Sequence, residues 1–232
     1  MYPVVFVSLG PGEADLITLK GLKALQSADC IFYPTTISKD GTKKSRAFDI
    51  LSELGITQTL IDFHVPMNKN RSLAIQSYES IAENIKQRFK NNEKVIVVAE
   101  GDVGFYSSIH YIADKLEQYN IPIDQIAGIP AFIACGALAG IHIVKQEEKL
   151  IVIPGIVTSN DLQLELEKGN VIVIMKTSQS EKAIKDCINQ LPSATYHYFE
   201  NVGVKDHEFY TKNIMDISMR KFPYFSLMII HK

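Results

Sequence analysis

Cysteine is scarce in this chain, and long apolar runs are absent. Cys30, Cys135 and Cys187 are scattered, odd in number and without paired spacing. This pattern argues against a disulfide framework and against a cysteine-based metal site, and it is typical of reduced thiols in a cytoplasmic protein. No apolar run approaches the roughly 20 residues that span a bilayer, and the first residues lack the basic stretch of a secretory signal. We therefore expect a cytoplasmic protein with no membrane partner.

An excess of charge of one sign is also missing. Lys and Arg number 24 against 26 Asp and Glu, which leaves a net charge of −2. Nucleic-acid binding is favoured by a basic face, so no nucleic-acid partner is expected. The 232 residues are 46% hydrophobic and 22% charged, which is ordinary for a soluble globular protein with one large domain or two small ones.

Short β-branched runs alternate with amphipathic segments through the first half of the chain. The pattern predicts strands over residues 4–9, 30–33, 59–65, 95–99 and 121–126. It predicts helices over 18–27, 47–54, 68–91 and 106–119. The second strand is expected to stop at Pro34, with a loop over residues 35–45. Regular alternation of strand and helix favours a parallel, doubly wound sheet.

The second half has short runs with fewer helices between them. Strands are expected over residues 150–153, 171–175, 195–200, 208–211 and 224–231, and helices over 131–140, 161–168 and 181–190. This pattern predicts a mixed sheet. The sequence therefore predicts two α/β domains, residues 1–122 and 123–232.

The stretch that directly follows the buried run at 95–99 is the strongest candidate for a binding loop. It reads Glu100-Gly101-Asp102, and ligands in open α/β sheets bind beyond the carboxyl ends of strands. Glycine there allows close approach of backbone to a ligand. The Asp102 carboxylate could accept hydrogen bonds either from ligand hydroxyls or from the loop's own N–H groups. An ordinary strand-to-helix turn is the competing interpretation.

Several common sites are not supported. Gly10-Pro11-Gly12 lacks the third glycine of a dinucleotide fingerprint, because that position is Asp15. There is no phosphate loop of Walker type, no nucleophile elbow and no histidine pair with metal-ligand spacing. His64 and His197 lie in strand-like runs, where hydrogen-bonded sheet histidines are expected. No metal site is predicted.

Three motifs in order resemble the tetrapyrrole methylase family. They are Gly10-Pro11-Gly12-Glu13, Glu100-Gly101-Asp102 and Gly128-Ile129-Pro130-Ala131, and the resemblance runs over about residues 4–230. Members use S-adenosylmethionine to methylate corrin and porphyrin precursors. The resemblance implies a two-lobed α/β fold, with a parallel-sheet N-terminal lobe, a mixed-sheet C-terminal lobe and the active cleft between them.

Further motifs resemble one subgroup, the precorrin-2 or cobalt-factor II C20-methyltransferases of cobalamin biosynthesis. They are Ile31-Phe32-Tyr33-Pro34, Val65-Pro66-Met67, Phe105-Tyr106-Ser107-Ser108, Met175-Lys176 and Pro223-Tyr224-Phe225-Ser226-Leu227. The uroporphyrinogen branch carries an aspartate, believed to act as base, where this chain has Pro34. No catalytic residue is therefore assigned. Glu13 and Val103 also depart from the family pattern, which has Asp and Pro there.

The resemblance implies a set of binding residues. Cofactor contacts are expected at Pro11, Gly101, Asp102, Val103, Phe105, Ser107, Ser108, Pro130, Ala131, Met175, Val202 and Ser226. Contacts to the substrate's carboxylates are expected at Arg46, Lys69 and Arg71. A homodimer is expected as well. Two alternatives remain, namely another corrin-ring methyltransferase of the family and a non-catalytic S-adenosylmethionine-binding protein with this fold.

Overall fold

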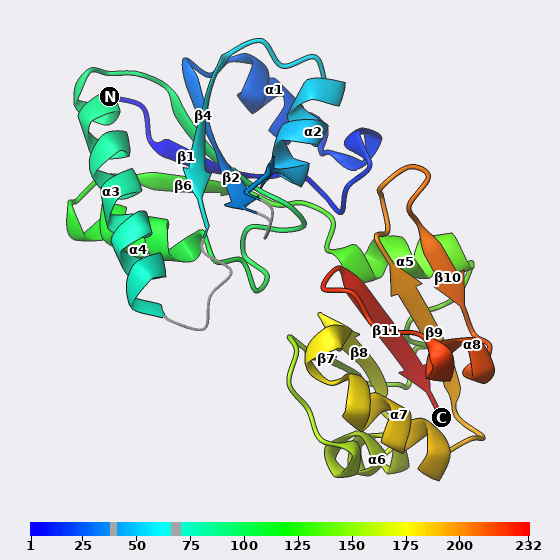
Figure 1. Ribbon diagram of the computed structural model, residues 1–232. Helices are drawn as coiled ribbons and strands as arrows, with labels where there is room; N and C mark the ends of the chain where they lie inside the picture. The colour runs from blue at the N-terminus through cyan, green and yellow to red at the C-terminus, as the bar shows by residue number, and fades with distance from the viewer. Residues whose placement is uncertain (38–40, 66–70) are drawn as a thin grey trace. The chain divides into compact units, whose positions relative to one another are not determined.

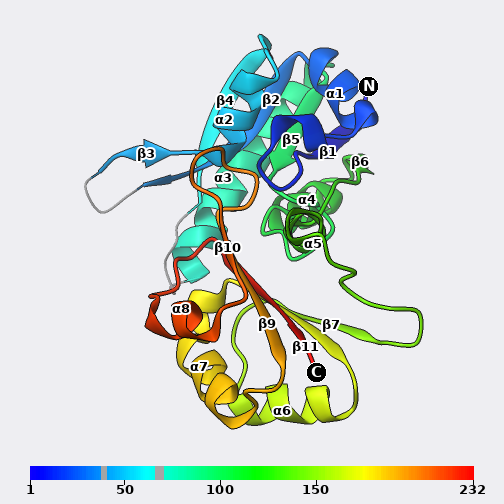
Figure 2. The same cartoon turned by 90° about the vertical axis from the view of Figure 1, so that its right-hand side faces the viewer.

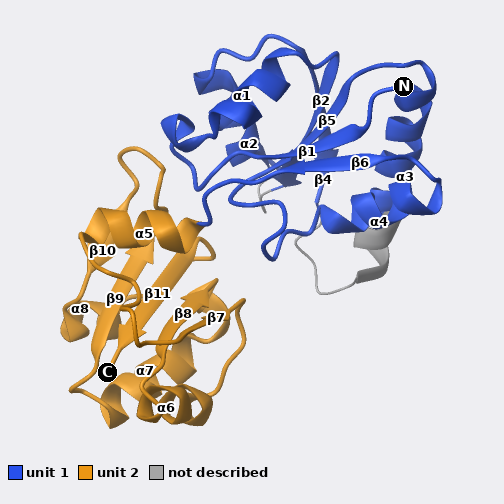
Figure 3. Ribbon diagram, turned by 180° about the vertical axis from the view of Figure 1, so that it is seen from behind, with its two compact units in different colours: residues 1–130 blue, residues 131–232 orange. Residues whose placement is uncertain are grey.

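The chain forms two compact units, residues Met1–Pro130 and Ala131–Lys232 (Figure 3). The computed structural model describes all residues except 38–40 and 66–70, and the side chains of 71–76 are likewise not described. The division falls later than the expected one at residue 122. The reason is that strand β6, Ile123–Ile126, pairs in parallel with the first strand and so belongs to unit 1.

Unit 1 is built on a parallel sheet with the spatial strand order β4-β2-β5-β1-β6. Its other strands are β1 (Val4–Ser8), β2 (Cys30–Ile37), β4 (Thr59–His64) and β5 (Val95–Ala99). All five residues of β5 are buried, as expected for a central strand covered on both faces. The parallel sheet predicted for the first half is confirmed.

Two pairs of helices cover the two faces of this sheet (Figure 1). Helices α1 (Leu19–Gln26) and α2 (Arg46–Glu53) pack on one face, and α3 (Arg71–Lys90) and α4 (His110–Gln118) pack on the other. A short 3₁₀ helix, η1 (Ala14–Leu16), precedes α1. The chain leaves β1 through α1 toward β2, and leaves β5 through α4 in the opposite direction toward β6. The neighbouring strands β1 and β5 thus form a topological switch point, where such sheets bind ligands.

The second strand is longer than predicted. Pairing with β5 ends at Phe32, but β2 continues through Pro34 to Ile37 alongside β4 and then β3. Proline is tolerated where a strand lies at a sheet edge, because it lacks the N–H that a central ladder needs. The expected loop over 35–45 instead contains β3, Lys43–Lys44, antiparallel to the end of β2 (Figure 2).

Unit 2 holds a five-stranded mixed sheet in the order β10-β9-β11-β8-β7, which confirms the expected mixed sheet. The strands are β7 (Leu150–Ile153), β8 (Val171–Met175), β9 (Thr195–Glu200), β10 (Phe209–Thr211) and β11 (Ser226–His231). Only the β7–β8 pair is parallel among the described strands of this unit. The predicted runs therefore fold nearly as the hydrophobic pattern indicates.

Three helices of unit 2 pack on one face of its sheet, around a core that includes Tyr196, Tyr198 and Met228. They are α6 (Ser159–Glu167), α7 (Glu181–Gln190) and α8 (Ile214–Met219), and a short 3₁₀ helix, η2 (Thr177–Gln179), follows β8. Helix α5 (Ala131–Ala139) contacts β11. Helix α8 was not predicted, because its six residues are too few to show a clear helical period of apolar side chains. Its start is marked by the Asn213 cap. No helix in the described part of the chain has the length and apolar character needed to cross a membrane.

His197 is a buried histidine on β9, as its strand pattern predicts. Its Nδ1 atom lies 2.9 Å from the hydroxyl of Tyr210, and its ring meets the His231 ring edge-on at 5.5 Å. Burial, helped by the charges of His231 and Lys212, lowers the pKa of His197 to about 4. The folded unit therefore holds this imidazole neutral where the unfolded chain binds a proton.

This difference predicts an acid-sensitive stability. Below pH 6.5, the ordinary pKa of histidine, His197 is protonated in the unfolded chain. In the folded protein it stays neutral until the pH reaches about 4. The free energy of unfolding therefore decreases as the pH falls from 6.5 to about 4. The loss reaches at most about 3 kcal/mol, taken at about 1.4 kcal/mol per tenfold change in the proton equilibrium. Urea unfolding of the wild type and of His197→Gln between pH 7 and pH 4 measures it. We expect a flatter profile in the variant, and parallel profiles would contradict the assignment.

Candidate functional site

Three loops meet at the carboxyl edge of the unit 1 sheet, after β1, β5 and β6. The first two are joined by their backbones: the Gly10 N–H donates to the Gly101 carbonyl at 3.1 Å, and the Gly101 N–H donates back at 2.6 Å. Gly101 has a φ of 69°, and a Cβ built there meets nothing within 4 Å. The loop thus keeps an open space beside its backbone at the switch point.

A buried serine and an aspartate tie these loops together. Ser8, fully buried at the end of β1, accepts the Val103 N–H at 2.9 Å and donates to Asp102 Oδ2 at 3.4 Å. The same Oδ2 accepts the Gly128 N–H at 2.7 Å, and Oδ1 accepts the Gly104 N–H at 2.9 Å. Of the two roles open to Asp102, the structure shows the bracing of protein N–H groups.

The segment after Asp102 remains irregular for longer than predicted. Tyr106 adopts a left-handed φ of 51°, so α4 begins at His110 instead of Tyr106. The Phe105 N–H donates to the Asp102 carbonyl at 3.1 Å, and the Phe105 and Tyr106 rings meet edge-on at 4.8 Å. Ser107 is half-buried and Ser108 is exposed. These candidate residues therefore follow the braced loop directly.

Glu100 and Arg46 form an electrostatic pair that the sequence reasoning did not single out. Burial raises the pKa of the Glu100 carboxyl, while Arg46 opposes that rise and Asp49 adds to it. Burial lowers the pKa of Arg46, and the charges of Glu100 and Asp49 raise it. Arg46 begins α2 beside its cap Ser45, whose hydroxyl donates to the Pro34 carbonyl at 2.7 Å. Arg46, which is expected to contact a substrate carboxylate, thus already interacts with the carboxylate of Glu100.

The remaining predicted binding residues of unit 1 are only partly described by the structure. Pro11 is buried in the first loop, and Pro130 is half-buried and ends the unit. Lys69 lies outside the described residues, and Arg71 is the first residue of α3 with its side chain outside the description. No group of three or more His, Cys, Asp or Glu side chains within the described residues could hold a metal ion.

In unit 2 the candidates gather where β8 and β9 end and β11 begins. Met175 ends β8 and is the neighbour of Leu227, and Ser226 pairs with Glu200 across β11 and β9. Val202 is buried just beyond the end of β9. The Ser226 hydroxyl lies 2.6 Å from that of Thr177 and donates to the Pro223 carbonyl. Ala131, the first residue of α5, is half-buried.

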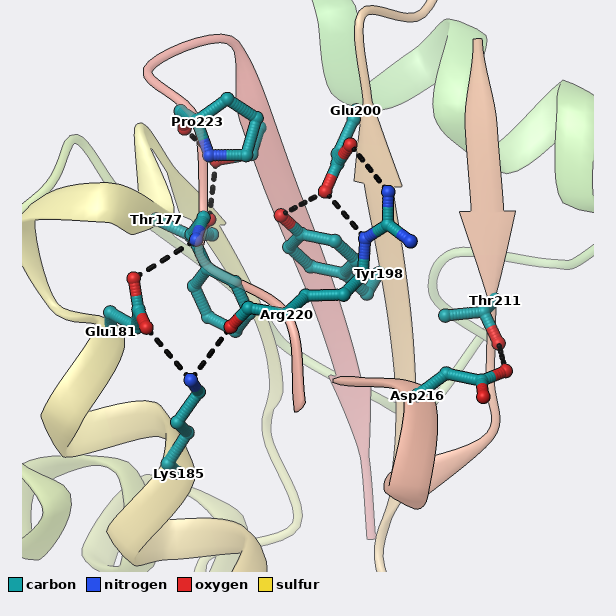
Figure 4. Close-up of polar contacts among 11 residues, drawn as sticks. Thr177, Glu181, Lys185, Tyr198, Glu200, Thr211, Asp216, Arg220 and Pro223 are labelled. Carbon is teal, nitrogen blue, oxygen red and sulfur yellow. Dashed lines mark hydrogen bonds and ion pairs between the residues drawn. The ribbon is translucent and has the colours of Figure 1, made fainter. Parts of the chain in front are cut away.

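A charged network holds the segment that leads into Ser226 (Figure 4). Glu200 is only 8% exposed, and both its oxygens accept from Arg220, at 2.9 and 3.0 Å. The Tyr198 hydroxyl donates to Glu200 at 2.8 Å. These hydrogen bonds hold the pKa of Glu200 below its ordinary value, although burial acts against them. Lys185 adds a second tie, because it pairs with Glu181 at 2.7 Å and donates to the Arg220 carbonyl at 2.7 Å.

Comparison with known proteins identifies the family. Residues 3–218 match the family described as Tetrapyrrole (Corrin/Porphyrin) Methylases. The chain belongs to this family. The resemblance drawn from the three glycine motifs is therefore confirmed.

Two curated relatives of the methylase carry the same activity in their names. The probable cobalt-precorrin-2 C(20)-methyltransferase of Methanocaldococcus jannaschii is 30% identical over 171 residues, which cover 74% of this chain and 70% of the relative. The precorrin-2 C(20)-methyltransferase of a Sinorhizobium species is 26% identical over 234 residues, which cover 98% of this chain and 94% of the relative.

A solved structure confirms the fold. Uroporphyrin-III C-methyltransferase from Thermus thermophilus, complexed with S-adenosyl homocysteine, superposes with a TM-score of 0.69 at 14% identity. The match covers 100% of this chain and 98% of that chain. Members of the tetrapyrrole methylase family bind S-adenosylmethionine or its demethylated product.

The bracing role of Asp102 yields a prediction for this methylase. Asp102→Ala removes the acceptor for the Gly128 and Gly104 N–H groups and the partner of Ser8, so the three loops lose their common tie. We expect S-adenosylmethionine affinity to fall about tenfold or more, since one hydrogen bond to a charged group contributes about 1.5–3 kcal/mol. Isothermal titration calorimetry measures this, with Asp124→Ala, an exposed aspartate of β6, as the control. Equal affinity of Asp102→Ala and wild type would remove Asp102 from the site.

Proposed function

We propose that this protein transfers the methyl group of S-adenosylmethionine to carbon 20 of precorrin-2 or cobalt-factor II. The observation that carries the proposal is the agreement of two relatives on this activity, one of them matched over 98% of this chain. The motifs at Ile31-Phe32-Tyr33-Pro34 and Phe105-Tyr106-Ser107-Ser108 support the same subgroup. The absence of the uroporphyrinogen-branch aspartate at position 34 favours it over that branch.

S-adenosylmethionine is the proposed methyl donor, and the loops of unit 1 suit it. The open space at Gly101 and the fixed φ of that residue give a small molecule direct access to backbone atoms. We propose that Pro11, Val103, Phe105, Ser107, Ser108 and Pro130 contact the donor from unit 1. We propose Ala131, Met175, Val202 and Ser226 as its contacts in unit 2. Apolar walls with backbone donors suit an adenine ring, which hydrogen-bonds along one edge.

The donor supplies an activated sulfonium methyl group, so the protein's task is to bind and orient. Carbon 20 of a reduced tetrapyrrole is electron-rich, so it would form a bond to the methyl carbon as the methyl–sulfur bond breaks and S-adenosyl homocysteine leaves. This displacement needs the reacting atoms in line at about 3–3.5 Å. Holding the two reactants in this geometry contributes about 7 kcal/mol or more to lowering the barrier. The hydrogen-bonded brace of Ser8 and Asp102 fixes the loop that would perform this positioning. A proton lost from carbon 20 can pass to water, so no dedicated base is required.

The carboxylates of the tetrapyrrole need cationic partners at the protein surface. We propose Arg46, Lys69 and Arg71 for this role. Arg46 is held near Glu100, so a substrate carboxylate would compete with Glu100 for the guanidinium. Burial raises the pKa of Glu100 and Arg46 opposes that rise, so engagement of Arg46 by a substrate carboxylate would raise the pKa of Glu100 further.

A direct assay tests the activity. The protein is incubated with S-adenosylmethionine and precorrin-2, with and without cobalt, and products are analysed by mass spectrometry and carbon-13 NMR. We expect one added methyl group at carbon 20, absent when the donor is omitted. Methylation at another ring carbon would replace the C20 assignment with another activity of the family. Donor binding with no product from either substrate would favour the non-catalytic alternative.

We also propose that the protein is a homodimer that uses apolar side chains of unit 2. Ile133 and Leu138 of α5 are 45% and 44% exposed, on a helix composed almost wholly of apolar residues. Native mass spectrometry gives the mass of the assembly, and Leu138→Glu should shift it to the monomer. A monomeric wild type at micromolar concentration would refute the dimer.

A further inference from the structure

Lys176 occupies a position where its backbone would suit glycine better. It follows Met175 at the end of β8 and adopts a left-handed φ of 53°. Its carbonyl accepts the Gln179 N–H at 3.0 Å, which starts the turn η2. For a residue with a Cβ the left-handed conformation is unfavourable, because the Cβ comes too close to the following carbonyl oxygen. Such positions concentrate at functional sites, so the side chain itself calls for an explanation.

The ammonium of Lys176 has no carboxylate partner among the described residues. Its described contact is with the ring of Tyr224, whose centroid lies 5.8 Å from Nζ. The two carboxylates of the neighbouring network are already engaged: Glu200 pairs with Arg220, and Glu181 pairs with Lys185. Within the described part of the chain, the positive charge of Lys176 therefore has no paired carboxylate at this edge of unit 2.

Two aromatic rings are exposed beside this lysine. Tyr224 is 37% exposed and Phe225 is 43% exposed, and their rings meet edge-on at 5.2 Å. The segment that bears them is fixed, because the Asn201 N–H donates to the Phe225 carbonyl at 2.9 Å and Ser226 donates to the Pro223 carbonyl. Fixed and exposed aromatic rings offer contact area at little cost in conformational entropy.

We propose that Lys176, Tyr224 and Phe225 bind the tetrapyrrole substrate, with the rings against the macrocycle and the ammonium paired with one peripheral carboxylate. The inference rests on the proposed function and deepens it by assigning substrate contacts in unit 2. A flat polycarboxylate needs both an apolar surface and a cation, and this edge supplies the two together. The neighbouring residue Met175 is the proposed donor contact, so Lys176 would orient the ring beside the methyl group.

The decisive experiment compares Lys176→Met with Lys205→Met, which removes an exposed lysine elsewhere in unit 2. Binding of uroporphyrin, a flat polycarboxylate, is followed by fluorescence, and S-adenosylmethionine binding is followed by calorimetry. We expect Lys176→Met to weaken uroporphyrin binding about tenfold, as for the loss of one charged hydrogen bond, with donor affinity within twofold of wild type. Lys205→Met should match the wild type in both.

Two further variants separate charge from backbone strain. Lys176→Gly removes the ammonium but suits the left-handed φ, and it should weaken uroporphyrin binding as Lys176→Met does. Lys176→Arg should restore most of the affinity, and Tyr224→Ala should reduce it. Unchanged binding by Lys176→Met or Lys176→Gly would overturn the proposal, as would an equal loss of donor affinity. Uroporphyrin binding is measured without turnover. A failure of these substrate contacts can therefore be distinguished from a failure of the proposed methyl transfer to carbon 20.

Discussion

Gly128→Ala is expected to lose S-adenosylmethionine binding and to unfold unit 1 at much lower urea concentration. A Cβ at this position would lie 2.3 Å from the Ser8 Cβ and 2.9 Å from the Gly101 carbonyl oxygen. Neither atom can rotate away, since Ser8 lies in the buried strand β1 and Gly101 is bridged to Gly10. The loop after β6 must therefore move.

Movement of that loop breaks the hydrogen bond from the Gly128 N–H to Asp102, which is 2.7 Å long. Overpacking costs about 1–3 kcal/mol, and loss of a hydrogen bond to a charged group costs about 1.5–3 kcal/mol. We therefore expect a loss of stability of about 3–5 kcal/mol, measured by urea unfolding, and donor binding too weak for calorimetry.

Gly101→Ala is the matched control for the predicted loss of stability. Its Cβ would meet nothing within 4 Å, so only the positive φ of 69° opposes the change. We expect about 1 kcal/mol of destabilisation from the left-handed conformation. Donor binding should still fall, because the methyl group would occupy the open space beside the loop. Gly128→Ala with wild-type stability and affinity would show that the three loops can separate without consequence.

Hydrophobic pattern was sufficient to predict most of the fold. The runs at β5 and β8 are buried strands because their β-branched residues fit a sheet covered on both faces. Helix α1 lies within the predicted range 18–27, and the Thr18 hydroxyl caps it by accepting the Gly21 N–H at 3.1 Å. The errors lie where tertiary contacts outweigh local preference, as in β2, where pairing with β4 carries the strand through Pro34.

The candidate site was less predictable. Strand order brings the loops after β1, β5 and β6 to one edge, but sequence could not reveal that Ser8 and Asp102 tie them. Ser8 appears as an ordinary residue inside a strand, and only the switch from apolar neighbours to a hydroxyl marks it. Glu100 belongs to the motif Glu100-Gly101-Asp102, but its interaction with Arg46 depends on how α2 packs on the sheet. The Glu200–Arg220 pair likewise depends on tertiary structure, because it joins the end of β9 to the residue that caps α8.

Arg220→Ala is expected to destabilise unit 2 strongly, because it breaks a largely buried ion pair. The guanidinium supplies a hydrogen bond to each oxygen of Glu200, and it stacks 3.6 Å from the Phe209 ring centroid. Without it, the Glu200 carboxylate, on a residue that is 8% exposed, keeps the Tyr198 hydroxyl as its one hydrogen-bond donor among the described side chains. Breaking one side of a buried ion pair costs about 3–5 kcal/mol, and the partial exposure of Arg220 favours the lower end. Urea unfolding measures the loss.

The pH dependence and a double variant distinguish this cause from simple loss of packing. In the wild type the pKa of Glu200 lies below its ordinary value, so its pairing stabilises the fold above the unfolded pKa and is lost as the pH falls. In Arg220→Ala, burial should instead raise that pKa, so the gap between variant and wild type widens as the pH rises from 4 to 7. Arg220→Ala with Glu200→Gln removes the charge, and it should recover about half of the lost stability at pH 7. The contradicting outcome is a stability difference between variant and wild type that does not change with pH, together with no recovery in the double variant. The lost stability would then come from the contact with Phe209, because loss of a ring contact does not change any protonation equilibrium.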